Sequence, residues 1–306
     1  MELDAFSLAK QFSHVGEARV AYCDEGSGPP VVLVHGCPFS SFVWRNIVPA
    51  LAATGHRVLA PDLLGLGDTE TPPGTDWSLP AQAATVLAWL DLLGLARVSL
   101  VGHDHGGAVA QLLAADHPER IERLVLCNVE AYDNWPSSDE RPFIVATQVP
   151  VVGRVVLWAW SRPVLLRWAL AAGHAVADHS VLSGELVRGY VRANLSDPHK
   201  RAKTRRFLAG QLDPTNNQAT SAAIDGLRRF GRPTLLLWGG KDPHFGPPWA
   251  ERLAADTPGV EHIEVVANAG HLLMEDQPER VAKVLVQFLT SRIQTSARHE
   301  SASARP

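Results

Sequence analysis

The fold is decided by one stretch of this 306-residue chain, Val98-Ser99-Leu100-Val101-Gly102-His103-Asp104-His105-Gly106-Gly107. Its first four residues are mostly apolar and of the kind that strands favour, and an Ala/Leu run typical of a helix follows the glycine pair. Small residues around Asp104 permit a sharp turn in which a strained backbone pushes one side chain outward. The stretch therefore predicts a strand, a tight turn and a helix, with Asp104 presented at the turn.

Strand-like and helix-like segments alternate on both sides of this turn. Segments that predict strands stand at 31–34, 57–60, 121–127, 233–238 and 262–266. The apolar runs at 31–34, 121–127 and 233–238 indicate strands of a parallel sheet that are buried on both faces. The alternation stops between Tyr132 and Phe230, where tryptophans and arginines are frequent and no run predicts a strand. This order indicates an α/β fold with a mostly parallel, doubly wound sheet and an inserted helical cap.

We expect four segments along the chain. Residues 1–131 and 231–293 form the two parts of the core, and residues 132–230 form the cap. Residues 294–306 are rich in Ser, Ala and Arg and are predicted to be disordered. Within the cap, the stretch 151–170 is apolar, but three arginines and a proline interrupt it. This pattern favours a cap or core helix pair over a membrane span.

Composition and charge narrow the classes of protein. Hydrophobic residues make up 46% of the chain and charged residues 20%, which is ordinary for a soluble globular enzyme. The net charge of −4 offers no electrostatic reason to bind nucleic acid or an anionic membrane. Cys23, Cys37 and Cys127 lack the spacing of a metal site, so we expect buried free thiols and no metal. Because the N-terminus has no signal-peptide pattern, we expect a cytoplasmic protein. We expect it to be a monomer or a homodimer.

Two further polar residues follow predicted strands near the end of the chain. Asp242 lies in the loop after the run 233–238, and His271 lies in the loop after the run 262–266. Catalytic groups gather at the carboxyl ends of strands in such sheets, so we expect both beside Asp104. The chain order of nucleophile, acid and histidine is that of the α/β-hydrolases. Any one of the three residues alone is weak support, whereas the three in the correct loops are strong support.

The chain resembles the epoxide hydrolase and haloalkane dehalogenase branch of that superfamily from about Phe12 to Leu289. The segment His35-Gly36-Cys37-Pro38 matches the branch's His-Gly-x-Pro motif, and the segment 102–107 matches its Gly-His-Asp-x-Gly-Gly motif. The resemblance implies a hydrolase that needs no cofactor. It also implies an oxyanion hole formed by the backbone N–H groups of Cys37 and His105.

An aspartate nucleophile limits the chemistry. A carboxylate suits attack on a saturated carbon that carries a leaving group, because the product is a stable ester, whereas attack on a carbonyl yields a reactive anhydride. Hydrolysis of that ester needs a water molecule activated by a base, and His271 is the expected base. Asp242 would orient the imidazole and stabilise its cation. Glu130 is the alternative acid, because some dehalogenases that this chain resembles place the acid after the strand preceding the cap. Counted from the nucleophile, however, their acid position corresponds to Asn128 and not to Glu130, so we favour Asp242.

Three substrate classes remain open, and each lacks a part of its template. In the haloalkane dehalogenases that the chain resembles, a Trp after the nucleophile holds the halide, whereas His105 stands here. Haloacid dehalogenases carry Arg just after the nucleophile, where this chain has His105 and Ala108. Epoxide hydrolases pull on the ring oxygen with a pair of cap donors, and Tyr190 is the first candidate for such a donor.

We therefore expect a small apolar organic substrate that reacts with water, an epoxide first and a carbon–halogen compound second. The residues expected to contact it are His35, Tyr190 and Trp135, the last because an indole N–H from the cap can hold a halide. An ester or lactone hydrolase and a ligand receptor on the same fold are further alternatives.

Overall fold

The computed structural model describes Phe6 and residues 10–291 of the chain. The predicted tail 294–306 and the last two residues of the predicted core, 292–293, lie outside the described residues.

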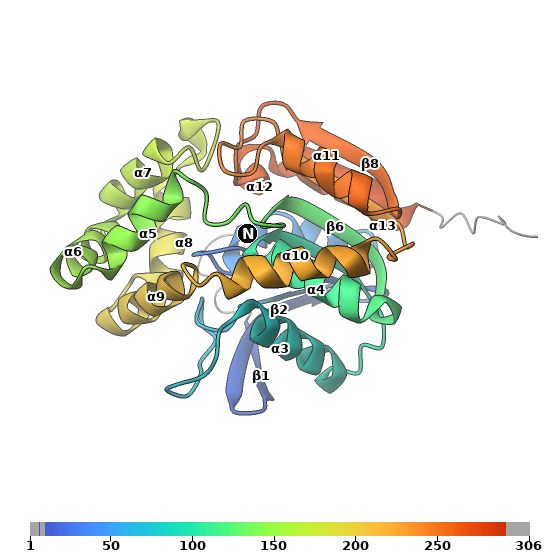
Figure 1. The fold of residues 1–306 in the computed structure, drawn as a ribbon, viewed down its shortest axis with the longest axis horizontal. Helices are drawn as coiled ribbons and strands as arrows, with labels where there is room; N and C mark the ends of the chain where they lie inside the picture. The colour runs from blue at the N-terminus through green and yellow to red at the C-terminus, as the bar shows by residue number, and fades with distance from the viewer. Residues whose placement is uncertain (1–5, 7–9, 292–306) are drawn as a thin grey trace, which may run out of the picture.

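An eight-stranded sheet forms the centre of the molecule, in the order β1-β2-β4-β3-β5-β6-β7-β8 (Figure 1). β1 pairs with β2, and β2 with β4, in antiparallel fashion, and the other neighbouring pairs are parallel. The predicted mostly parallel sheet is therefore confirmed. The strands are β1 (Gln11–Val15), β2 (Ala18–Gly26), β3 (Pro30–Val34), β4 (Arg57–Pro61), β5 (Val98–Asp104), β6 (Ile121–Val129), β7 (Thr234–Gly239) and β8 (Val260–Val266).

The middle strands are buried on both faces, as their continuous apolar runs predict. All residues of β7 are buried, as are all but one in each of β3, β5 and β6. The edge strand β1 was not predicted, because its short sequence mixes polar and apolar residues and it lies largely exposed. The buried strands place their carboxyl ends, and the loops that follow them, along one edge of the sheet.

Helices cover the sheet and occupy the connections between strands. The core helices are α2 (Val48–Ala52), α3 (Leu79–Leu92), α4 (His105–Asp116), α11 (Pro247–Asp256), α12 (Leu273–Asp276) and α13 (Pro278–Thr290). The expected helix around residues 42–53 is divided into a 3-10 turn, η1 (Ser41–Trp44), and α2. Pro49 lies in the first turn of α2, where the missing N–H of proline is tolerated, so a new helix begins there.

The inserted helices follow β6 and precede β7. Figure 1 shows most of them at one end of the molecule, away from the α11 and α13 side of the sheet. They are α5 (Glu140–Gln148), α6 (Pro150–Trp160), α7 (Pro163–Ala172), α8 (Gly184–Asn194), α9 (Pro198–Gly210) and α10 (Thr215–Leu227), with a short 3-10 turn, η3 (His179–Val181), before α8. Another 3-10 turn, η2 (Pro118–Arg120), belongs to the core and connects α4 to β6. The last of the inserted helices, α10, lies along α4 of the core, where Gly226 packs against Ala115.

No single helix within residues 10–291 is both long and apolar enough to cross a membrane. The pair α5 and α6 passes that test in length and composition, but its two helices meet at a bend of 112°.

Candidate active site

The turn after β5 has the strained geometry that its glycines predict. Asp104 has φ +55° and ψ −123°, a conformation uncommon for a residue with a side chain. The turn needs glycine beside it, because a Cβ on Gly106 would stand 2.4 Å from the carbonyl oxygen of Val34. A Cβ on Gly36 would stand equally close, 2.4 Å, to the Cβ of Asp104 itself. The two glycine-containing motifs thus let β3 and β5 bring their ends together.

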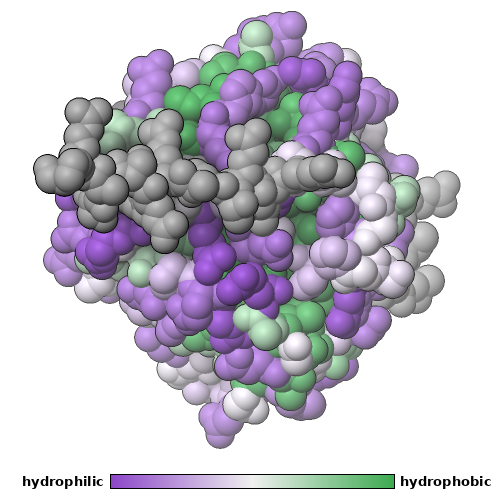
Figure 2. All heavy atoms as spheres, turned by 90° about the vertical axis from the view of Figure 1, so that its right-hand side faces the viewer, coloured by the Kyte–Doolittle hydropathy of each residue, from purple (hydrophilic) through white to green (hydrophobic). Residues whose placement is uncertain are grey.

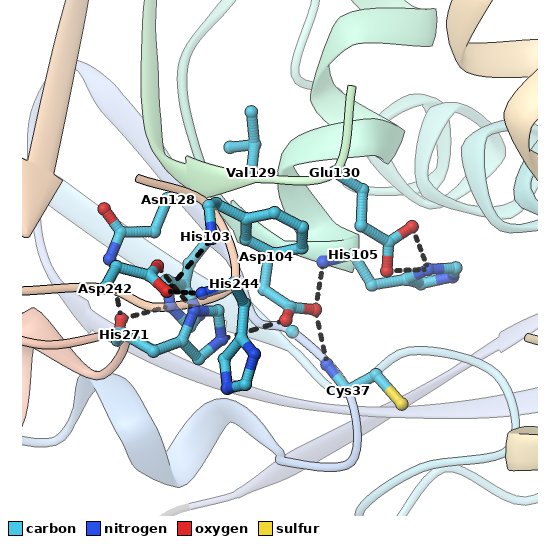
Figure 3. A network of polar contacts seen from close by, with 12 residues as sticks. Cys37, His103, Asp104, His105, Asn128, Val129, Glu130, Asp242, His244 and His271 are labelled. Carbon is cyan, nitrogen blue, oxygen red and sulfur yellow. Dashed lines mark hydrogen bonds and ion pairs between the residues drawn. The ribbon is translucent and has the colours of Figure 1, made fainter. Parts of the chain in front are cut away.

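His271 lies between two carboxylates that come from different loops (Figure 3). Its Nε2 is 2.9 Å from Oδ2 of Asp104, and its Nδ1 is 3.0 Å from Oδ2 of Asp242. The other oxygen of Asp242 accepts hydrogen bonds from the backbone N–H groups of His244, at 2.8 Å, and Phe245, at 3.1 Å. The structure therefore brings together the three residues that the sequence proposes as nucleophile, base and acid.

The second oxygen of Asp104 occupies the place expected for an oxyanion. Oδ1 accepts hydrogen bonds from the backbone N–H of Cys37, at 3.0 Å, and from the backbone N–H of His105. These are the two donors that the resemblance implies. Since both N–H groups converge on one oxygen, they can hold the nucleophile in place before reaction and stabilise negative charge on that oxygen during ester hydrolysis.

The charges of the three triad residues shift one another's pKa values. Burial acts to raise the pKa of Asp104, but its hydrogen bond to His271 and the charge of His271 lower that pKa to about 2. Burial acts to lower the pKa of His271, but the charges and hydrogen bonds of Asp242 and Asp104 raise it well above its usual value. The two carboxylates therefore favour the protonated, positively charged form of His271.

The alternative acid, Glu130, lies on the other side of the nucleophile. Both of its carboxylate oxygens are 3.1 Å from Nδ1 of His105, and both residues are buried (Figure 3). Burial acts to lower the pKa of His105, but the charge of Glu130 raises it. The structure thus places Asp242, and not Glu130, against His271.

Asn128 has a positioning role that the sequence did not reveal. Its Nδ2 donates to the carbonyl oxygens of Gly270 and His271, each at 3.1 Å, and its Oδ1 accepts from the N–H of Gly239 at 2.8 Å. The imidazole Nε2 of His103 also lies 3.0 Å from the carbonyl oxygen of His271. These contacts connect β6 and β7 to the loop that carries His271 and so fix the position of His271 relative to the sheet.

A cavity of about 650 Å³ lies between the triad and the cap. Cys37 and His271 line it from the core, and residues of α5, α7, α8 and α9 line it from the cap. Most of the wall is apolar, including Phe39, Leu166 and Leu208. A site of this size and lining suits a small organic molecule.

Comparison with known proteins agrees with this geometry. The family model described as alpha/beta hydrolase fold matches residues 29–278. The chain belongs to the α/β-hydrolase superfamily. A haloalkane dehalogenase from Mycolicibacterium paratuberculosis is 32% identical to this hydrolase over 87% of the chain and 86% of the relative's length. With the Asp104 elbow, this likeness places the hydrolase in the aspartate-nucleophile branch.

Two further relatives carry other names. A cis-3-alkyl-4-alkyloxetan-2-one decarboxylase from Shewanella oneidensis is 32% identical to this α/β hydrolase over 89% of the chain and 85% of the relative. The solved structure of the epoxide hydrolase CorEH is 29% identical and superposes with a TM-score of 0.75, covering 92% of this chain and 98% of CorEH. The branch is therefore shared by relatives whose names describe different reactions.

Two of the expected substrate contacts line the cavity of the hydrolase, but their donors are occupied. The indole N–H of Trp135 donates to Oε1 of Gln211 at 2.9 Å. The hydroxyl of Tyr190 donates to Glu275, which also accepts two hydrogen bonds from Arg45, at 2.6 and 2.7 Å. Both side chains offer their rings to a substrate. The indole N–H of Trp135 is bound within the cap, whereas the hydroxyl of Tyr190 joins the cap to the core.

His35 does not lie at the cavity, contrary to the sequence expectation. Its Nδ1 donates to the carbonyl oxygen of Gly36 at 2.8 Å, and its Nε2 accepts from the N–H of Leu63 at 3.0 Å. The ring is fully buried, and burial lowers its pKa to about 4. His35 is therefore an uncharged structural residue that connects the loop carrying Cys37 to the loop after β4.

Two residues of the cavity wall, Glu140 and Trp160, were not singled out from the sequence, although Trp160 was one of the cap tryptophans considered as indole donors. Glu140, in the first turn of α5, has its Oε1 3.8 Å from Nε2 of His244. Burial raises the pKa of Glu140 to about 8, and the charge of Asp104 adds to that effect against an opposing contribution from His271. Trp160 stacks on Phe143 with ring centroids 4.4 Å apart. No hydrogen bond of the Trp160 indole N–H occurs among the described residues. Neither residue belongs to a motif, so only the folded cap reveals them.

Proposed function

We propose that this protein is a hydrolytic dehalogenase that acts on small apolar haloalkanes through an ester of Asp104. The observation that carries the proposal is the Asp104 carboxylate, held by two backbone N–H groups on one oxygen and by His271 on the other. The apolar cavity beside it and the 32% identical haloalkane dehalogenase support the substrate class. That relative is the reason for ranking the carbon–halogen bond ahead of the epoxide, which the sequence alone favoured.

In the first step, an oxygen lone pair of Asp104 attacks the carbon that carries the halogen. The carbon–halogen bond breaks, and the halide leaves with the electron pair. Asp104 becomes a neutral ester, and its negative charge no longer raises the pKa of His271. The imidazolium then gives up its proton, so the reaction itself produces the base that the second step needs.

In the second step, His271 removes a proton from water, and the water oxygen attacks the ester carbonyl carbon. The N–H groups of Cys37 and His105 stabilise the charge that develops on the carbonyl oxygen. Asp242 stabilises the imidazolium that forms again. The ester C–O bond then breaks, the leaving alkoxide takes the second proton of the water molecule, and Asp104 is regenerated as a carboxylate with one oxygen from water. The net reaction consumes a haloalkane and water and yields an alcohol, a halide and a proton.

The indole N–H of Trp160 is the cavity group best suited to hold a halide. Trp160 stands in the wall of the cavity, and no described residue accepts a hydrogen bond from its indole N–H. The indole N–H of Trp135 is already bound to Gln211 and is less suited. We therefore expect Trp160→Phe to slow halide release more than Trp135→Phe does.

The test is a panel of bromoalkanes and styrene oxide, with bromide release and diol formation measured separately. Bromide release is expected to be the faster reaction. Turnover in ¹⁸O-water should place label in Asp104, detected by peptide mass spectrometry, and His271→Gln should accumulate the alkyl ester as a mass adduct. Asp104→Asn is the matched control that should form no adduct. Active enzyme with unlabelled Asp104 would exclude the ester, and diol formation without bromide release would reverse the order of substrates.

Epoxide hydrolysis is the second candidate, and Glu140 is the observation that favours it. An epoxide oxygen leaves as an alkoxide and needs a proton, whereas a halide does not. Glu140 lines the cavity, and its pKa raised to about 8 favours the protonated form, which can donate to the ring oxygen. The structural likeness to CorEH also supports this candidate.

The pH profile separates the two candidates. If Glu140 donates the proton, epoxide opening should fall as the pH rises through about 8, because the carboxyl then loses its proton. Glu140→Gln should remove this decline and lower the rate by roughly two to four orders of magnitude. Bromide release by the same variant is the internal control and should show little change. Equal loss of both activities would argue against a proton-donor role.

A further inference from the structure

Large apolar side chains are exposed mainly on one part of the cap. Of the twelve large hydrophobic residues that are exposed within residues 10–291, nine lie between positions 145 and 168. The three others, Phe12, Leu92 and Val265, lie on separate elements of the core. The nine residues, here called the outer cap surface, are Val145, Val149, Val151, Val152, Val155, Trp158, Val164, Leu165 and Trp168.

The outer cap surface follows helical spacing. On α6, Val151, Val155 and Trp158 are four and three residues apart and so lie on one face of the helix. On α7, Val164 and Trp168 are four residues apart, and their exposed fractions are 70% and 73%. The buried positions of the same helices, Leu157 and Leu166, are also apolar. These helices are thus apolar toward the protein and toward the outside.

The same helices carry only positive charge. No Asp or Glu occurs from Arg141 to Ala177, and this segment contains four exposed arginines, although the whole chain has a net charge of −4. A groove of about 720 Å³ between α6 and α9 adds three more arginines. No carboxylate of the described chain forms an ion pair with any of the seven. They are Arg141, Arg154, Arg162, Arg167, Arg201, Arg205 and Arg206.

We propose that α6 and α7 dock the protein on an anionic lipid surface. Exposed valine, leucine and tryptophan side chains would enter the boundary between headgroups and acyl chains, and the arginines would contact lipid phosphates. The expectation of no membrane contact rested on the net charge of the whole chain, which hides this local excess. The opposite face of the molecule differs, because most of its coloured residues in Figure 2 are hydrophilic.

A second copy of this chain is the competing occupant of the outer cap surface. In a two-fold dimer the same patch meets itself, so both partners would bring unpaired arginines to the interface. Like charges in that position repel, whereas anionic headgroups neutralise them. The charge pattern therefore favours lipid over self-association.

The position of the surface fits an apolar substrate. The inner side of α7 contributes Leu166, Ala169 and Leu170 to the wall of the catalytic cavity. Docking through α7 would place that cavity next to the acyl chains, where a small apolar compound concentrates. This consequence rests on the proposed function, whereas the docking itself does not.

The test is sedimentation of the full chain with vesicles of phosphatidylcholine alone and with vesicles containing about one third phosphatidylglycerol. We expect binding to the anionic vesicles and much weaker binding to the neutral ones. Arg154→Gln, Arg162→Gln and Arg167→Gln together should weaken binding to anionic vesicles by about fivefold for each arginine. Val151→Ser, Val164→Ser and Trp168→Ser together should reduce binding to both kinds of vesicle.

Leu92→Ser is the matched control, because Leu92 is 55% exposed on α3, away from the cap, and should leave vesicle binding unchanged. Thermal unfolding midpoints of all variants should stay near that of the parent protein, which separates docking from misfolding. Failure of the parent protein to bind anionic vesicles would overturn the proposal. So would a stable dimer, measured by sedimentation equilibrium, that the Val151/Val164/Trp168 variant converts to monomers. Neither outcome depends on whether the protein is a dehalogenase.

Discussion

Asp104, His271 and Asp242 form a row of alternating charges, with contacts of 2.9 and 3.0 Å. Two negative neighbours raise the pKa of His271 and so favour its protonated form, in which the imidazole does not act as a base. Alkylation of Asp104 removes one of those neighbours, which lowers the pKa of His271 at the moment when a base is needed. His271 therefore becomes available as a base only after Asp104 has been alkylated, so hydrolysis follows alkylation.

The first prediction separates the two acids at this scale. Asp242→Asn should slow hydrolysis of the alkyl ester by roughly three to four orders of magnitude, because the imidazole loses its orienting carboxylate. Glu130→Gln should leave that step nearly unchanged, because Glu130 contacts His105 and not His271. Single-turnover measurement of ester decay checks both variants. A larger loss in Glu130→Gln would move the acid role to Glu130.

At the scale of elements, a buried ion pair of the core binds a tyrosine of the cap and so connects the two parts near the triad. Arg45 follows η1, Glu275 lies on α12, and Tyr190 lies on α8. Arg45 and Tyr190 both donate to the Glu275 carboxylate, whose side chain is only 2% exposed. Since α12 begins two residues after His271, this contact also restrains the histidine loop.

The second prediction concerns Tyr190. Tyr190→Phe should lower the free energy of unfolding by about 1.5–3 kcal/mol, because a buried carboxylate loses a hydrogen bond. Turnover at saturating substrate should persist, since the hydroxyl is directed to Glu275. Arg45→Met should cost more, about 3–5 kcal/mol, because it leaves Glu275 buried and unpaired. Urea unfolding and steady-state kinetics give both quantities. A loss of epoxide turnover at unchanged stability would make Tyr190 a substrate donor after all.

Across the whole molecule, a second buried network joins the start of the described chain to the cap. Nζ of Lys10 lies 2.6 Å from Asp62 and 2.9 Å from Asp68, and Lys200 on α9 lies 2.9 Å from Asp68. Asp62 also accepts the backbone N–H of Ser41 at 2.8 Å. One carboxylate thus links the N-terminal segment, the oxyanion region and, through Asp68, the cap.

The third prediction is a loss of stability in acid. Burial acts to raise the pKa of Asp62, but Lys10 and other partners lower it, and the pKa values of Asp104 and Asp242 are also lowered. A carboxyl with a lowered pKa in the folded state stabilises the fold above its unfolded pKa of about 3.9. That stability is lost as the pH falls below this value toward the folded pKa.

Urea unfolding between about pH 7 and pH 2 measures this dependence. Asp62→Asn should be less stable at neutral pH, because Lys10 is left without its closer partner, and its stability should fall less steeply in acid. An unchanged acid slope in Asp62→Asn would show that Asp62 does not contribute. Glu140 acts in the opposite sense, because its raised pKa of about 8 costs stability as the pH rises above its unfolded value.

The sequence by itself determined the buried parallel strands, the elbow and the position of Asp104 on it. Buried parallel strands are recognisable because they are apolar on both faces, and the turn at Asp104 needs its glycines for local steric reasons. The apolar run of a strand and the glycines beside Asp104 are both formed by residues close together in the sequence, so both can be recognised without the folded structure. Asp242 and His271 were located because each lies in the loop that follows a predicted strand, the first buried and the second partly exposed.

Tertiary structure alone decided which groups are free to act. Asp242 and Glu130 both follow strands, and only the packed sheet shows that Asp242 contacts His271. His35, Trp135 and Tyr190 carry suitable donors, but other residues of the protein, most of them distant in the sequence, occupy their polar atoms. The raised pKa of Glu140 and the exposure of α6 and α7 likewise depend on the environment created by packing. Burial, partner and exposure are properties of contacts between remote segments, so no local pattern in the chain encodes them.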